Sequence, residues 1–131
     1  MILLMFAIQV APVPALQPEP ESEVLVIGRR LEEWRSKLTS EKGRLTCVTK
    51  RSTGDAEIDA IGCTAMTDCF PKAQPAFEAT RAKGLARDER KRLMTVAEQA
   101  MIACVTPRRA ELVRELAIRR KAQSAVSGVT Q

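Results

Sequence analysis

Four cysteines are the residues of this chain whose chemistry is most restricted by their spacing. They are Cys47, Cys63, Cys69 and Cys104. Structural zinc sites pair their cysteines at C-x2–4-C spacing, and thiol redox centres use C-x-x-C. Neither spacing occurs in this sequence. The cysteines are therefore predicted to form two disulfides, for which three pairings exist.

The two middle cysteines decide among these pairings. Cys63 and Cys69 lie on one predicted helix, which places their Cα atoms about 9 Å apart along the axis and about 120° apart around it. A disulfide needs Cα atoms within about 7 Å, so this pair is excluded together with its complement. Cys69 and Cys104 each belong to the apolar stripe of a helix, whereas Cys63 lies on a flank that faces the segment around Cys47. We therefore predict the disulfides Cys47–Cys63 and Cys69–Cys104, each contributing about 2–4 kcal/mol.

No group of side chains in the sequence indicates catalysis. The chain has no histidine, which excludes mechanisms that depend on a histidine base or metal ligand of its own. The run DAEID from Asp55 to Asp59 begins like a calcium loop. Such a loop would need glycine in place of Ala60 and a bidentate acid in place of Met66. We predict no catalytic, cofactor-binding or metal-binding residue and no cofactor; an enzyme with dispersed catalytic residues is the third alternative for the function.

Positive charge is the remaining chemical feature. The formal net charge is +5, and such a balance favours anionic partners. The candidate face for an anionic partner lies on the last predicted helix and comprises Arg108, Arg109, Arg119, Arg120 and Lys121. A second basic cluster spans Arg87–Arg92. Aromatic residues make up only 3% of the chain, so bases would find few side chains to stack on, and nucleic acid is not expected as a partner.

The hydrophobic pattern predicts a mainly α domain that positions these residues. Four to five short amphipathic helices are expected, at residues 28–42, 55–70, 75–83, 87–104 and 108–122. Pro71 and Pro75 are expected to end the second helix, because proline does not fit a helix interior. The apolar run 24–27 and the β-branched run 44–49 allow for a small strand or hairpin.

The N-terminal residues resemble a targeting signal. Residues 1–10 (MILLMFAIQV) are almost wholly apolar and carry no charged side chain. This run is too short for a membrane span, which needs about 20 residues. The small residues of APVPA then predict cleavage after Ala15. The predicted organisation is a signal peptide at 1–15, a Pro/Glu-rich linker at 16–23, a disulfide-stapled helical domain at 24–122 and a flexible tail at 123–131, with no transmembrane span in the mature chain.

Two resemblances agree with export. Residues 23–30 (EVLVIGRR) resemble the E-x-V-V-x-G-x-R segment near the N-terminus of TonB-dependent receptors. The segments VIGRRLEEWR, LTCVTKRSTGDAEIDAIGC and KRLM are similar to small uncharacterised exported proteins of Gram-negative bacteria. The resemblance implies a periplasmic or secreted location, where disulfides persist. We therefore expect a non-enzymatic protein that binds an envelope partner or has a structural role there; the alternative is a binder of anionic surfaces or ligands through the basic C-terminal helix.

Intact mass tests export and disulfide formation together. We expect the protein purified from a cell-envelope fraction to begin at Leu16 and to contain no thiol that alkylates before reduction. After reduction, four thiols should react, one for each cysteine. Retention of Met1 together with four thiols that react at once would contradict both predictions.

Overall fold

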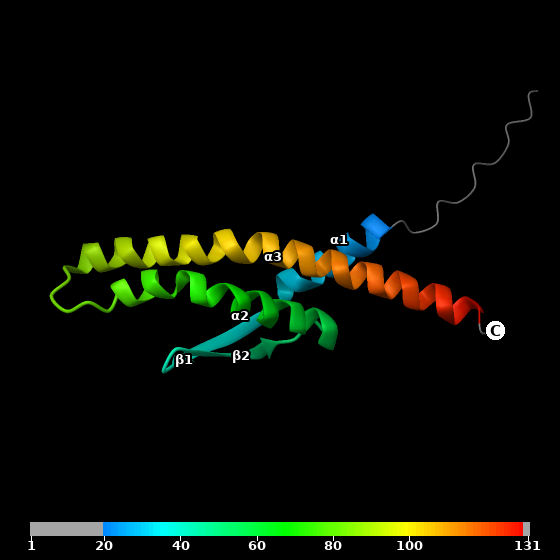
Figure 1. Ribbon diagram of the computed structural model, residues 1–131, viewed down its shortest axis with the longest axis horizontal. Coiled ribbons are helices and arrows are strands. Elements are labelled where there is room, and N and C mark those ends of the chain that lie inside the picture. Colours follow the sequence, from blue (N-terminus) through cyan, green and yellow to red (C-terminus); the bar gives the residue numbers. More distant parts are fainter. Residues whose placement is uncertain (1–19, 130–131) are drawn as a thin grey trace, which may run out of the picture.

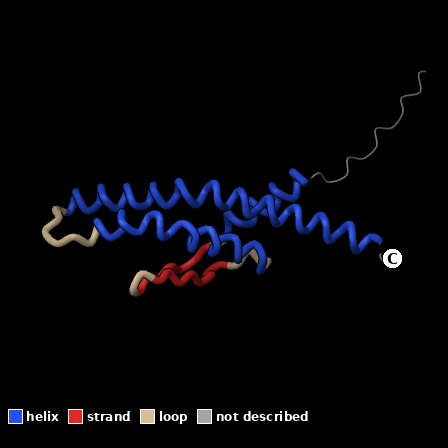
Figure 2. Tube along the Cα trace, viewed as in Figure 1, coloured by secondary structure: helices blue, strands red, loops and turns tan. Residues whose placement is uncertain are grey.

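The computed structural model describes residues 20–129. In this range the element order is α1 (Pro20–Glu33), β1 (Arg35–Glu41), β2 (Arg44–Arg51), α2 (Ala56–Ala79) and α3 (Arg87–Val129). Figure 1 shows α2 and α3 as a long antiparallel helical pair, with α1 crossing α3. The two strands lie along α2 on the side away from α3 (Figure 2). The predicted signal peptide, residues 16–19 of the linker and residues 130–131 lie outside the described residues.

The domain is mainly helical, as predicted, but residues 20–129 form three helices instead of four or five. Pro71 and Pro75 lie inside α2, and Pro107 lies inside α3. The expected helix ends at these prolines are therefore wrong. Residues 123–129, predicted as part of a tail, also belong to α3.

Solvent exposure explains why these prolines are tolerated. A proline leaves the carbonyl four residues before it without its helical donor. The three carbonyls concerned belong to Thr67, Pro71 and Ala103, all of which are exposed residues. Water can satisfy these carbonyls, while the opposite face of each helix stays packed against its neighbour. Packing therefore keeps both helices continuous.

The N-terminal part of the domain also differs from the sequence prediction. Residues 24–27, considered as a strand, belong to α1, and the helix predicted to run to residue 42 ends at Glu33. Residues 35–41 instead form β1, which pairs antiparallel with β2. Lys42 and Gly43 form the turn, with φ values of 50° and 77°, and two positive φ angles are what a tight hairpin turn requires. The predicted strand at 44–49 is confirmed and extends to Arg51.

Two apolar clusters hold these elements together. The first joins α1, the start of α2 and the second half of α3, and its buried residues are Ile27, Leu31, Trp34, Ile58, Ile61, Val113, Leu116 and Ala117. The second joins the remainder of α2 to the middle of α3 through Ala65, Cys69, Ala73, Met101 and Val105. Met66 and Leu112 pack against both clusters. The core therefore follows the α2–α3 interface from end to end.

Both predicted disulfides are present. Cys47–Cys63 joins β2 to α2 with a Cα–Cα distance of 5.6 Å, and Cys69–Cys104 joins α2 to α3 with a distance of 5.7 Å. The exclusion of a Cys63–Cys69 bond is correct for the reason given, because both residues lie on α2. The hairpin and α3 are thus covalently tied to the same central helix.

The contact between Trp34 and Gly62 leaves no room for a side chain on α2. A Cβ atom at Gly62 would lie 2.7 Å from three atoms of the Trp34 ring. We expect Gly62→Ala to lower the free energy of unfolding by about 1–3 kcal/mol through overpacking, measured by urea denaturation. The control is Gly28→Ala on α1, where nothing lies within 4 Å of the new Cβ. This variant should be stabilised by about 0.5–1 kcal/mol; equal effects of the two substitutions would show that the Trp34 contact does not limit the site.

Candidate anion-binding groove between α1 and α3

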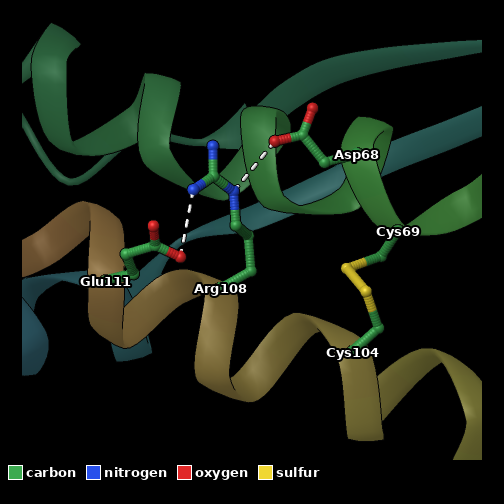
Figure 3. Close-up of a disulfide and its surroundings, with 5 residues drawn as sticks. All are labelled: Asp68, Cys69, Cys104, Arg108 and Glu111. Carbon is green, nitrogen blue, oxygen red and sulfur yellow. Dashed lines mark hydrogen bonds and ion pairs between the residues drawn. A yellow bond between two sulfur atoms is a disulfide. The ribbon is translucent and has the colours of Figure 1, made fainter.

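Most arginines of the predicted basic face form ion pairs with acids of α2. Arg108 Nε lies 3.0 Å from Asp68 Oδ2, and Arg108 Nη1 lies 3.2 Å from Glu111 Oε2 on its own helix. Figure 3 shows Arg108 between these two carboxylates, one helical turn from Cys104 of the disulfide. Arg119 contacts Glu57 at 3.6 Å. These contacts fasten α3 to α2 and partly neutralise the face predicted to attract an anion.

The shortest of these ion pairs lies at the N-terminus of α2. Arg120 Nη2 lies 2.6 Å from Asp55 Oδ2, and both side chains are mostly buried, with exposed fractions of 24% and 20%. Asp55 is also the N-cap of α2, because its carboxylate accepts hydrogen bonds from the backbone N–H groups of Glu57 and Ile58. Burial opposes ionisation, but the hydrogen bond from Arg120 and those from the backbone outweigh it and lower the pKa of Asp55. Asp55 therefore caps the N-terminus of α2 and also forms an ion pair with Arg120 of α3.

Arg109 differs from the other arginines of the basic face. Its guanidinium carbon lies 5.5 Å from the centroid of the Trp34 ring, a cation–π contact. Its Nε is buried and has no hydrogen-bond partner among the described residues. Burial lowers the pKa of the Arg109 guanidinium, and the positive charge of Arg35 lowers it further. No carboxylate of residues 23–129 forms an ion pair with Arg109.

Arg109 lines a hollow of about 610 Å³ between α1 and α3, which we name the α1–α3 groove. Its apolar wall includes Val24, Leu25, Leu31 and Val113. Its charged side chains are Arg29, Arg109 and Arg114, with Glu32 as the one carboxylate in the lining. The volume falls within the range of about 300–1,000 Å³ that is usual for ligand sites. Three cations beside apolar side chains can bind a group that is both acidic and partly apolar.

Comparison of the chain with protein-family models, with curated proteins and with solved structures gives no match. The site must therefore be interpreted from its own geometry. None of the helices formed by residues 20–129 is long and apolar enough to cross a membrane. Within the same residues, no cluster of three or more potential ligand side chains could hold a metal ion.

The groove contains one predicted site residue and two that the sequence analysis did not select. Arg109 belongs to the predicted face, whereas Arg29 and Arg114 were not part of it. Arg119 and Lys121 lie on the exposed surface of α3, away from the groove lining. Arg114 lies four residues after Ala110 of the same lining, a spacing that places both on one face of α3. Arg109 is five residues from Arg114, about 140° around the helix, so the helical pattern did not link the two arginines. The contribution of Arg29 depends on how α1 crosses α3, which the sequence pattern does not specify.

The carboxylate of Asp55 should make stability depend on pH. Because its pKa in the folded protein lies below the ordinary value of 3.8, ionised Asp55 stabilises the fold above that pH. This contribution is lost as the pH falls through the lower folded-state pKa. Asp55→Asn keeps a capping oxygen but removes the charge. We expect the variant to be less stable than the parent protein at pH 6 by about 1–3 kcal/mol. The difference should shrink as the pH falls below the ordinary pKa of 3.8.

Chemical denaturation at a series of pH values measures this difference. Glu115→Gln is the matched control, because Glu115 is an exposed acid on α3 outside the ion pairs described above. It should follow the parent protein across the whole range. Parallel stability curves for Asp55→Asn and the parent protein would rule out a stabilising charge at Asp55.

Proposed function

We propose that this protein is a non-enzymatic, periplasmic or secreted protein of the cell envelope that binds an acidic segment of a partner protein in the α1–α3 groove. The observation that carries the proposal is Arg109, a half-buried cation in the groove lining without a carboxylate partner among residues 23–129. A buried polar group without a partner is costly, so a ligand that supplies an acceptor gains binding energy there.

The covalent structure supports an oxidising compartment. All four cysteines are engaged in disulfides, and disulfides of this kind persist in the periplasm and outside the cell. The apolar N-terminal run, with small residues before the predicted cleavage site, supports the same location.

Three carboxyl groups are held in their ionised form by structural contacts. The pKa values of Asp55, Asp59 and Glu89 are all lowered. At the two aspartates, hydrogen bonds to the ionised form outweigh the opposing effect of burial; at Glu89, the hydrogen bond from Arg92 lowers the pKa. A general acid near neutral pH needs the opposite shift.

The shape of the site favours a projecting segment over a flat anionic surface. Arg109 stacks on the buried Trp34 and lies in a hollow, where a planar bilayer would not reach it without disturbing α1. Arg108 and Arg120, which would have served such a surface, are only partly exposed and already hold carboxylates of this chain. A narrow acidic segment can enter the groove and place apolar side chains against Leu25 and Val113.

Trp34 provides a direct test, because it is the one tryptophan of the chain and contacts Arg109. A short soluble peptide that alternates glutamate and leucine is titrated against the disulfide-bonded protein at low ionic strength. We expect Trp34 fluorescence to change as peptide is added and to reach a plateau when the site is saturated. The affinity for the peptide should fall when the salt concentration rises. The double variant Arg29→Gln/Arg114→Gln should bind about tenfold or more weakly, since it removes two of the three groove cations.

Two controls define the outcome. Arg119→Gln/Lys121→Gln removes the same amount of charge from the exposed side of α3 and should leave peptide binding almost unchanged. A peptide of lysine and leucine should not bind. If vesicles of phosphatidylglycerol bind more strongly than the acidic peptide, and Arg119→Gln/Lys121→Gln abolishes this binding, the anionic-surface alternative replaces the groove proposal.

A further inference from the structure

A second hollow lies between the β hairpin and the helical pair. Its volume is about 450 Å³, and its walls carry Leu38 and Leu45 from the hairpin, Phe70 and Phe77 from α2, and Met101 and Ile102 from α3. The two phenylalanine rings are stacked, with centroids 6.3 Å apart. Ile102 is 62% exposed although it borders this apolar space. The hollow therefore leaves large apolar side chains in contact with water.

A smaller hollow of about 280 Å³ adjoins the first one. The two share Ser40, Phe70, Phe77 and Arg81 in their linings. The smaller hollow is polar, because Lys42, Gln74 and Glu78 also line it. The apolar hollow thus adjoins the polar one, and Arg81 lines both.

Arg81 is the group at this junction best placed to hold an anion. Among residues 23–129, no carboxylate lies within ion-pair distance of its guanidinium, although Glu98 borders the apolar hollow and Glu78 the polar one. Glu78 already accepts a hydrogen bond from Gln74 at 3.1 Å. Lys42 adds a second positive charge at the polar end. A planar guanidinium binds a carboxylate through two parallel hydrogen bonds, which makes Arg81 suited to such a head group.

We propose that these joined hollows bind a long-chain fatty carboxylate. The hydrocarbon chain lies along Phe70, Phe77 and Ile102 and removes their apolar surface from water, which favours binding. The carboxylate binds Arg81, with Lys42 nearby and with Glu78 and Glu98 as opposing charges. This site involves none of the α1–α3 groove residues, so it stands independently of the proposed function.

The test uses the disulfide-bonded protein and oleate below its micelle concentration. Binding is followed by chemical-shift changes in two-dimensional amide NMR spectra, which also locate the ligand. We expect saturable shifts around the two hollows. Arg81→Gln should weaken oleate about tenfold, and Glu98→Gln should strengthen it several-fold, because the two side chains carry opposite charges. Oleyl alcohol, which has the same chain without the charge, should bind the parent protein and Arg81→Gln equally.

Matched variants on α3 distinguish binding in the hollows from non-specific binding to exposed apolar residues. Ile102→Glu places a charge in the apolar hollow and should abolish binding, whereas Val96→Glu alters another exposed apolar residue of α3 that lies outside both hollows. Both positions are exposed, so both variants are expected to fold, and circular dichroism checks this. Equal losses in the two glutamate variants, unchanged affinity in Arg81→Gln, or loss of binding in Arg29→Gln/Arg114→Gln would overturn the proposal; the last result would assign oleate to the α1–α3 groove.

Discussion

Trp34 is the residue on which the arrangement of the other elements depends. It follows the end of α1, is buried against Gly62 of α2, and donates a hydrogen bond from Nε1 to Thr49 Oγ1 of β2 at 3.0 Å. Arg109 of α3 covers its ring. One side chain therefore contacts both other helices and the hairpin. With so few aromatic residues in the chain, no second side chain of this size is available to replace it in the first apolar cluster.

The pairing of charges between α2 and α3 explains which arginines of α3 are held by carboxylates of this chain. The two antiparallel helices place Asp55 and Asp68 of α2 opposite Arg120 and Arg108 of α3. These pairs use the cations nearest to α2 and leave those that face α1. The α1–α3 groove is positive for this reason, although the whole basic helix also carries Glu111 and Glu115. The position of α1 thus gives a mixed helix surface a local groove lined by three arginines and one carboxylate.

The two disulfides attach different elements to α2. Cys69–Cys104 fixes α2 against α3 near the middle of both helices, next to the second apolar cluster. Cys47–Cys63 holds β2 against α2, while the turn at Lys42 and Gly43 lies farther along the hairpin. The apolar hollow is bordered by Leu38, which pairs with Cys47 in the sheet, and by Ser40 and Leu45 nearer the turn. The disulfide holds the hairpin to α2 near the middle of β2, and the part toward the turn leaves large apolar side chains in contact with water.

Local spacing determined the helical class, the strand at 44–49 and both disulfides. Helix geometry excluded one of the three pairings, because two cysteines six positions apart on a helix cannot bond. The apolar stripes that carry Cys69 and Cys104 then decided between the other two pairings. Tertiary packing decided the rest. Pro71, Pro75 and Pro107 stop an isolated helix, yet α2 and α3 continue through them because one face is packed and the other is solvated. Residues 35–41 fit a helical pattern up to Leu38 but pair with β2 instead. Contacts between residues far apart in the sequence also decide which arginines stay unpaired. The pattern of residues along the chain does not predict those contacts.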